Sequence, residues 1–495
     1  MKSLAELGLT AQGAREAQIT GLAVDSREVK PGFLFAALPG AHVHGGEFIQ
    51  YALRMQAAAI LTDAEGARIA ADELAGSDAA MIVAQDPRQA LAQTASLWFG
   101  AHPKTVVAVT GTNGKTSVST FCRQIWEELD IPGVNLGTTG VEGAWTHPLN
   151  HTTPEPITLH RVMAQAAENG ITHVAMEASS HGLDQRRLDG VILAAAGFSN
   201  FTQDHLDYHE TFEAYFAAKM GLFRRVLSED GVAVINLDDP KGAEVVRICA
   251  DRGQEIIGVG RHPDARLRLT GQRFDATGQD LLFEWQGRAR QARLELIGGF
   301  QAENVLLAAA LVIAAGADPD DVFETLPYLT TVRGRMELAA TRESGAAVFV
   351  DYAHTPDAVD TALKAMRPHV MGRIVVIVGA GGDRDTAKRP LMGAAAAQNA
   401  EIVIVTDDNP RSEDPASIRS AVMAGAVDAG GSDSITEVGD RAEAILRGID
   451  MLGAGDALLI AGKGHETGQV VGDTVLPFDD VEQASVAVAA LEGWI

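Results

Sequence analysis

The segment VAVTGTNGKTSVST contains a lysine and a threonine that could bind a nucleoside phosphate. Lys115 and Thr116 follow Gly114, after an apolar strand-like run and before a helix-like run. The start of a helix favours an anion, Lys115 would neutralise phosphate oxygens, and the Thr116 hydroxyl suits Mg²⁺. The usual P-loop, G-x-x-x-x-G-K-[ST], would need a glycine at Val109, but the glycine present is Gly111. The spacing predicts a variant phosphate-binding loop rather than an ordinary glycine-rich turn.

Three polar residues further along the chain could serve the same site. Glu177 lies at the end of the strand-like run THVAMEASSHG, where a carboxylate can reach a metal at a neighbouring phosphate loop. His205, in FSNFTQDHLDYH, could bind a metal or be an ordinary loop residue. Lys219 stands in the apolar run YFAAKMGLF, and the residues alone favour a side chain that extends along a helix to solvent. Taken singly, none of the three identifies a function.

Two segments in the C-terminal third are predicted loops that follow strands. GAGGDRD, residues 379–385, would need a glycine at Arg384 to be a dinucleotide-binding fingerprint, so we predict no NAD site there. DDNPR, residues 407–411, precedes a helix with Asp414 at its N-cap and Pro415 at its first position. Loops after strands often carry binding residues, so DDNPR is a candidate site as well as a loop.

The elements that must position these residues predict an α/β protein of three domains, because 495 residues are too many for one core. Residues 1–87 contain short strand-like runs and turn signals and should form a small α/β domain. Residues 88–334 should form a central P-loop ATPase domain with a parallel sheet, followed by an antiparallel ribbon. Residues 335–495 alternate strand and helix again and should form a Rossmann-like domain.

The composition of the chain argues against some classes of binding partner and indicates a cellular location. The chain has 40 basic and 66 acidic residues, and its net charge of −26 argues against nucleic acid or an anionic membrane surface. The longest apolar run, VLLAAALVIAAGA, is too short to span a bilayer, and the N-terminus lacks the apolar core of a secretory signal. Cys122 and Cys249 lack metal-ligand spacing and fit a reducing compartment, so we expect a cytoplasmic protein.

Seven motifs fall in the order and spacing of one known family: TGTNGKTS, MEASSHGLDQRR, NFTQDHLDYH, AKMGLF, GRME, DYAHTPDA and GKGHE. In these motifs, over nearly its whole length, the sequence resembles the Mur ligases, ATP-dependent enzymes that add amino acids to the peptidoglycan precursor. The family's own loop is G-x-x-G-K-[ST], which accounts for Val109. The segments VDSREVKPGFLFAALPGAHVHGG and DDNPR are similar to those of the members that add meso-diaminopimelate to UDP-MurNAc-L-Ala-D-Glu.

The resemblance implies a ligase that activates a carboxylate with ATP to an acyl phosphate, which an amine then attacks. It implies Mg²⁺ sites served by Thr116, Glu177 and His205, and a Lys219 carbamylated by CO₂ that binds a second Mg²⁺. Lys115, Lys219, His205 and Glu177 would be the catalytic residues. The enzyme would be a cytoplasmic monomer of cell-wall synthesis that takes UDP-MurNAc-L-Ala-D-Glu and meso-diaminopimelate, with no nucleic-acid partner and no membrane insertion.

The resemblance also implies three sets of binding residues. ATP would be bound by Gly111, Thr112, Asn113, Gly114, Lys115, Thr116, Ser117, Asn304, Arg335, Asp351 and His354. The last four come from the second and third domains, so ATP should lie at their interface, where domain closure could gate the reaction. The UDP-substrate would be bound by Ser26, His42, Val43, His44, His151, Thr152, Thr153, Ser179, Gln185 and Arg187, with His151 in place of an expected asparagine. Diaminopimelate would be bound by Arg384, Asp408, Asn409, Pro410, Arg411, Gly462 and Glu466.

Several alternatives remain open. The lysine-adding sibling and folylpolyglutamate synthetase would run related chemistry, although the latter lacks a nucleotide-sugar domain with the DSR…KPG pattern. A P-loop kinase would release no free phosphate, and a non-catalytic nucleotide switch would hydrolyse little ATP. Against the lysine-adding sibling, Arg384 and Arg411 could bind the distal carboxylate that only diaminopimelate carries, and Glu466 the ammonium beside it.

Overall fold

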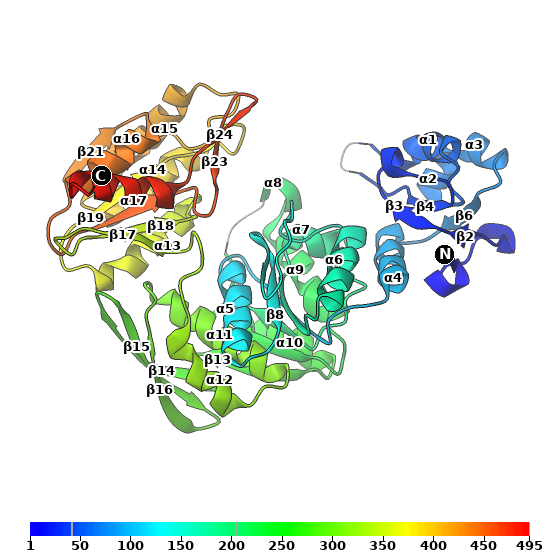
Figure 1. Cartoon of the computed structure of the whole chain (residues 1–495), viewed down its shortest axis with the longest axis horizontal. Coiled ribbons are helices and arrows are strands. Elements are labelled where there is room, and N and C mark those ends of the chain that lie inside the picture. The colour runs from blue at the N-terminus through cyan, green and yellow to red at the C-terminus, as the bar shows by residue number, and fades with distance from the viewer. Residues whose placement is uncertain (41–42, 203–205, 495) are drawn as a thin grey trace. The chain divides into compact units, whose positions relative to one another are not determined.

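The computed structural model describes residues 1–40, 43–202 and 206–494, and it confirms a mixed α/β protein built on parallel sheets (Figure 1). The chain divides into two compact units. The first holds residues 1–268 and 306–323, and the second holds residues 269–305 and 324–495. No helix in the described part of the chain is long and apolar enough to cross a membrane.

A four-stranded parallel sheet lies near the N-terminus. Its strands, in spatial order, are β3 (Gly21–Ala23), β4 (Phe33–Ala36), β5 (Ala59–Thr62) and β6 (Ala80–Val83). Its helices are α1 (Ile49–Arg54), α2 (Ala64–Ile69), α3 (Ala71–Ala75) and α4 (Pro87–Phe99), and short strands β1 (Lys2–Ser3) and β2 (Gln18–Ile19) pair beside it. Strand side chains alternate between two apolar clusters, so both faces of the sheet are buried.

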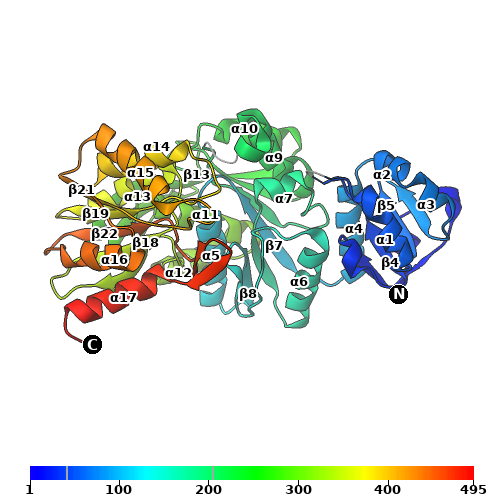
Figure 2. The ribbon, with the colours of Figure 1, turned by 90° about the horizontal axis from the view of Figure 1, so that it is seen from above.

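Helix α4 connects this sheet to the next one. It begins as its sequence predicts, with the Asp86 side chain accepting the N–H of Gln89 and with Pro87 at the first position. It packs against α6 (Pro156–Glu168), and Figures 1 and 2 both show the two helices side by side. Gly190 makes a close approach at this packing, because a Cβ there would lie 2.4 Å from the carbonyl oxygen of Ala92.

The central sheet carries the predicted phosphate loop. Its strands in the first unit, in spatial order, are β13 (Glu255–Gly260), β12 (Val232–Asn236), β11 (Ala195–Phe198), β7 (Thr105–Thr110), β10 (His173–Glu177), β8 (Gly133–Gly137) and β9 (Gly140–Gly143). All neighbours run parallel except β8 and β9. The helices are α5 (Lys115–Glu128), α6, α7 (Ser180–Asp184), α8 (Leu206–His209), α9 (Phe212–Gly221), α10 (Gly242–Asp251) and α12 (Pro319–Thr325), and the unit boundary passes through α11 (Phe300–Ala314). Helix α11 contains most of the apolar run VLLAAALVIAAGA, so the buried helix predicted there is confirmed.

The second unit begins with the antiparallel ribbon expected from the sequence. Its strands are β14 (Leu267–Asp275), β15 (Gly278–Trp285) and β16 (Arg288–Leu294). A six-stranded sheet follows in the spatial order β17 (Glu337–Thr341), β18 (Ala347–Asp351), β22 (Ala457–Ala461), β19 (Ile374–Val378), β20 (Ile402–Val405) and β21 (Ser434–Glu437), with only the β17–β18 pair antiparallel. A hairpin, β23 (Gly468–Val471) and β24 (Thr474–Pro477), comes after β22.

Helices cover both faces of the six-stranded sheet. One face packs on α13 (Pro356–Met366), α14 (Lys388–Asn399) and α15 (Pro415–Ala429), and the other on α16 (Arg441–Asp450) and α17 (Asp480–Leu491). Val376 faces the first cluster and its neighbours Val375 and Ile377 face the second, as alternation along a strand requires. This arrangement leaves the carboxyl ends of the parallel strands to carry the binding loops.

Candidate active site

The phosphate loop is a short turn between β7 and α5 that two glycines make possible. Gly111 has φ 150°, and a Cβ on it would lie 2.0 Å from Ser199 Oγ, so a side chain does not fit there. Gly114 has φ 86° and directly precedes the helix that begins at Lys115. The strand, turn and helix predicted from the sequence are therefore present, with the helix N-terminus available to an anion.

The two residues that follow β11, the strand paired with β7, hydrogen-bond to the phosphate loop. The Asn113 N–H donates to Asn200 Oδ1 at 2.8 Å, and the Thr112 N–H donates to the Asn200 carbonyl at 2.9 Å. The Ser199 hydroxyl donates to the Asn113 carbonyl at 2.6 Å. The loop motif alone does not predict Ser199 or Asn200. The sequence feature that could have indicated them is the segment FSN, in which both residues directly follow a strand.

Two lysines lie at the loop. Lys115 Nζ donates to the carbonyls of Gly111 and Thr112 at 3.0 and 2.8 Å. Lys219 Nζ donates to the same Gly111 carbonyl at 2.7 Å and lies 4.5 Å from the centre of the Tyr215 ring. The Lys219 residue is 1% exposed, so the interpretation that it extends to solvent is wrong. Both ammonium groups are held beside the turn that would receive phosphate.

Glu177 is buried at the end of β10 and meets the start of α5. The Thr116 hydroxyl donates to Glu177 Oε2 at 3.1 Å, and the Thr138 N–H donates to Oε1 at 2.8 Å. The Thr138 hydroxyl in turn lies 3.0 Å from that of Thr152. These are oxygen donors of the kind Mg²⁺ prefers, although the described residues include no group of three or more histidines, cysteines or acids arranged to hold a metal ion. His205 lies outside the described residues.

The predicted UDP-substrate residues of the central sheet form one connected group. The Thr153 hydroxyl donates to the Glu177 carbonyl at 2.9 Å and accepts the Ser179 N–H at 3.1 Å. The Arg187 guanidinium donates to the Thr153 carbonyl at 2.5 Å and to Gln185 Oε1 at 2.8 Å. The backbone of Glu177 is therefore hydrogen-bonded to the predicted substrate loop. His151, by contrast, is simply exposed.

The N-terminal sheet contributes the other predicted UDP-substrate residues. His44 Nδ1 accepts the Gly46 N–H at 2.9 Å, and its Nε2 lies 3.1 Å from Asp63 Oδ1. The first contact caps the start of the 3₁₀-helix Gly45–Phe48. Ser26 is half-buried at the start of another 3₁₀-helix, Ser26–Glu28, and Val43 is exposed. His42 lies outside the described residues.

Three of the four C-terminal residues predicted to bind ATP gather around Tyr352 in the second unit. The Arg335 guanidinium lies 4.8 Å from the centre of the Tyr352 ring, and His354 Nδ1 lies 2.8 Å from the Tyr352 carbonyl oxygen. Asp351 is buried at the end of β18, and this burial raises the pKa of its carboxyl. Asn304 is buried in α11. All four lie in the second unit, whereas the phosphate loop lies in the first.

The structure brings together the ends of β20 and β22, which carry the predicted amino-acid site. Asn409 Nδ2 donates to Glu466 Oε2 at 2.9 Å. Lys463 Nζ lies 3.1 Å from Asn409 Oδ1 and 3.2 Å from Glu466 Oε2. Asp408 and Pro410 are buried beside them. A Cβ on Gly462, with φ 114°, would lie 2.6 Å from Asp408 Oδ2. Lys463 was not among the predicted residues, although it stands inside the GKGHE motif.

The two predicted arginines lie near one another at the same site. Arg411 has φ 51° and donates to the Gly382 carbonyl at 2.8 Å. A Cβ on Gly381 would lie 2.9 Å from Arg411 Nη1 and 3.9 Å from the Arg384 side chain. Hydrogen bonds from Ser412 and then the charges of Arg411 and Arg384 lower the pKa of Asp383. Within the described residues, neither arginine has a carboxylate within 4 Å, so both can bind an added carboxylate.

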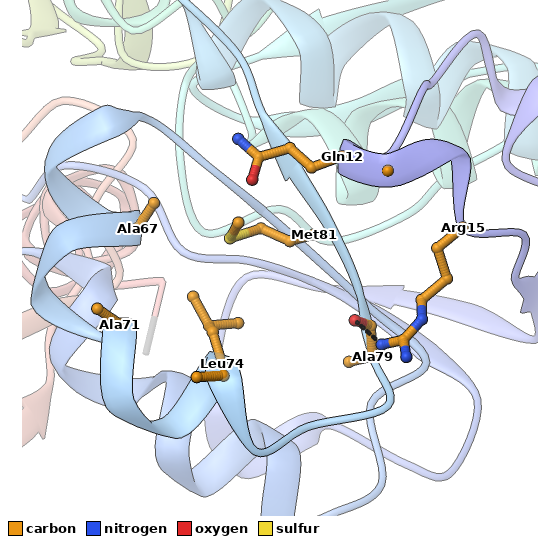
Figure 3. A pocket seen from close by; sticks show the side chains of 9 residues that line it. Gln12, Arg15, Ala67, Ala71, Leu74, Ala79 and Met81 are labelled. Atoms are coloured by element: carbon orange, nitrogen blue, oxygen red, sulfur yellow. Dashed lines mark hydrogen bonds between the residues drawn. The ribbon is translucent and has the colours of Figure 1, made fainter.

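A separate pocket in the N-terminal part is shown in Figure 3. Its lining is mainly apolar and includes Leu74 and Met81. Arg15 at its edge donates to the carbonyl of Ala79 at 3.3 Å. None of the residues predicted from the sequence lines this pocket, so it is not part of the candidate active site.

Comparison with known proteins identifies the family. Three family models match the chain: "Mur ligase family, catalytic domain" over residues 18–98, "Mur ligase middle domain" over 109–312 and "Mur ligase, glutamate ligase domain" over 334–464. A curated relative from Bradyrhizobium diazoefficiens, named UDP-N-acetylmuramoyl-L-alanyl-D-glutamate--2,6-diaminopimelate ligase, is 48% identical and covers 96% of this chain and 95% of its own. This chain belongs to the Mur ligase family.

Other members of the Mur ligase family support the same assignment. A relative of the same name from Caulobacter vibrioides is 45% identical over 97% of both chains. A solved structure, also described as UDP-N-acetylmuramoyl-L-alanyl-D-glutamate--2,6-diaminopimelate ligase, is 34% identical, covers 96% of this chain and 95% of its own, and has a TM-score of 0.71. The Mur ligase resemblance and the three-domain α/β fold predicted from the sequence are confirmed. The domain limits at residues 87 and 334 stay predictions.

Proposed function

We propose that this Mur ligase adds meso-diaminopimelate to UDP-MurNAc-L-Ala-D-Glu, with ATP converted to ADP and phosphate through an acyl phosphate. The names of the relatives at 45–48% identity support this reaction. The structural observation that carries it is the cluster at the ends of β20 and β22, where Asn409 hydrogen-bonds the Glu466 carboxylate and Arg411, two residues further on, lies beside Arg384. Two cations and an acid complement an amino-acid end that carries both a carboxylate and an ammonium.

The first unit would activate the carboxylate. Activation brings two anions together, so cationic groups and backbone N–H groups at the loop should dominate the catalysis. Lys115 and the start of α5 would hold the ATP phosphates. Thr116 and Glu177 would hold Mg²⁺, and family likeness adds His205 and a carbamylated Lys219. Mg²⁺, when bound, would neutralise phosphate charge.

The other ligands are assigned by the same proposal. Arg335, Asp351, His354 and Asn304 would contact adenine and ribose. The connected group around Thr153 and Arg187, together with Ser26 and the HVH segment, would bind the UDP-substrate. We place the enzyme in the cytoplasm, because its substrates are soluble precursors and both of its cysteines are free. Family likeness adds that it acts as a monomer.

Phosphate release tests the proposed reaction. Release should require ATP, UDP-MurNAc-L-Ala-D-Glu and meso-diaminopimelate together, because the acyl phosphate decomposes productively only when the amine attacks. A P-loop kinase would release ADP without free phosphate, and a nucleotide switch would hydrolyse little ATP under any of these conditions. Phosphate release that is independent of the amino acid would contradict the proposal. Release with a folate and glutamate would favour the folylpolyglutamate synthetase alternative.

A further inference from the structure

Lys463 places an ammonium group entirely inside the protein, beside the proposed amino-acid site. Its side chain is 0% exposed, on the loop that follows β22. Burial of an ammonium is costly unless the group is paired and hydrogen-bonded. Lys463 Nζ has two such acceptors, Asn409 Oδ1 at 3.1 Å and Glu466 Oε2 at 3.2 Å. Because it has no exposed surface, Lys463 can act on a bound amino acid only through these neighbours.

The three side chains form a closed triangle of contacts. Asn409 Nδ2 donates to Glu466 Oε2 at 2.9 Å, so Lys463 and Asn409 both use the same carboxylate oxygen. The Val470 N–H donates to Asn409 Oδ1 at 2.9 Å and fixes the orientation of the amide. The Glu466 side chain is 33% exposed, and none of the hydrogen bonds in the described part of the chain uses its Oε1. That second oxygen can therefore accept from a bound ammonium.

We infer that Lys463 is a positioning residue that makes this site prefer an amino acid with a distal ammonium beside its distal carboxylate. This inference rests on the proposed function. Lys463 holds the Glu466 carboxylate in one orientation, while Arg384 and Arg411 bind the distal carboxylate of the amino acid. Removing Lys463 leaves the carboxylate of Glu466 without its charge partner. The loss should therefore affect recognition of the ammonium and leave recognition of the carboxylate in place.

Two substrates separate these effects. 2-Aminopimelate has the chain and both carboxylates of diaminopimelate but lacks one amine. The unmodified enzyme should use meso-diaminopimelate with the higher kcat/KM. In Lys463→Met, kcat/KM for meso-diaminopimelate should fall about 10- to 100-fold, mainly through KM, as expected for hydrogen bonds to charged groups. The value for 2-aminopimelate should fall much less, so the preference between the two should collapse.

Controls distinguish positioning from a general structural role. Lys364→Met removes a lysine of the same unit from a pair with Asp360, but its side chain is 65% exposed, and it should leave both kcat/KM values unchanged. In a Glu466→Gln background, Lys463→Met should change the preference less than about twofold, because no carboxylate is left to orient. If Lys463→Met does not fold, Lys463→Gln, which keeps a donor but removes the charge, is measured in its place.

The two proposals fail in different ways. If folded Lys463→Met retains the preference of the unmodified enzyme, or if both substrates lose the same factor, the positioning role is wrong. If the unmodified enzyme does not use meso-diaminopimelate, the proposed function itself is wrong.

Discussion

Replacing Asp480 with asparagine should destabilise the C-terminal sheet by about 3 kcal/mol, because the carboxylate pairs with a fully buried arginine. Arg441 and Asp480 are both 0% exposed, with Nε–Oδ1 and Nη2–Oδ2 distances of 2.7 and 2.6 Å. Arg441 also donates to the carbonyls of Ala461 and Asp407, which immediately precede Gly462 and Asp408 of the amino-acid site. Removing one partner of a buried pair typically costs about 3–5 kcal/mol, and asparagine keeps one acceptor, so the lower end is expected.

Helix α16, which carries Arg441, also offers a matched control. Arg447 pairs with Glu443 on α16, but their side chains are 58% and 50% exposed, so Glu443→Gln should cost less than about 1 kcal/mol. Amide hydrogen exchange in β22 is the suitable assay, because a chain of several domains need not unfold in one transition. Protection in β22 should fall by a factor of about 100 or more for Asp480→Asn only. Equal, small changes in both variants would refute the reasoning.

Three further predictions concern single side chains. Burial lowers the pKa of His160 from 6.5 to about 4. The unfolded chain therefore binds a proton first as the pH falls, and up to about 3 kcal/mol of stability should be lost from pH 6.5 to 4. His160→Gln should flatten that part of the pH dependence of thermal unfolding, and an unchanged slope would exclude His160 as its source. Lys115→Ala should abolish turnover with little change in the melting temperature without ATP, whereas lost stability with intact ATP affinity would indicate a structural turn. Lys219→Ala should lose most turnover but still bind the UDP-substrate, and mass spectrometry of the unmodified enzyme should detect a carbamate. Near-normal turnover of Lys219→Ala at saturating ATP would contradict the metal role.

The sequence predicted local features of the site well, because their causes are local. Lys115 and Thr116 are adjacent to the glycine turn that positions them, and Glu177 stands at the end of an apolar strand. Asp414 and Pro415 likewise begin α15 as predicted, with the Asp414 side chain accepting the Ser417 N–H. Each of these follows from a few consecutive residues.

Contacts between distant segments could not be predicted in this way. Asn200 braces a loop 87 residues earlier in the chain, and Lys463 meets Asn409 across 54 residues. The expectation that Lys219 extends to solvent was wrong because a lysine in an apolar helix can either reach solvent or be buried, and the local sequence is the same in both cases. Only the tertiary fold, which places the Gly111 carbonyl 2.7 Å from its ammonium, decides between them.

A competition between two amino acids tests the central claim most directly. The unmodified enzyme is given ATP, Mg²⁺, UDP-MurNAc-L-Ala-D-Glu and equal concentrations of meso-diaminopimelate and lysine, and the products are separated by mass. The site's arginines would be left unpaired by lysine, and such a site can reject the analogue by roughly 10⁴–10⁵. We therefore predict the diaminopimelate product almost exclusively, with Arg411→Ala losing most of that preference through a higher KM for diaminopimelate. Comparable amounts of the two products from the unmodified enzyme would contradict the assignment and favour the lysine-adding sibling.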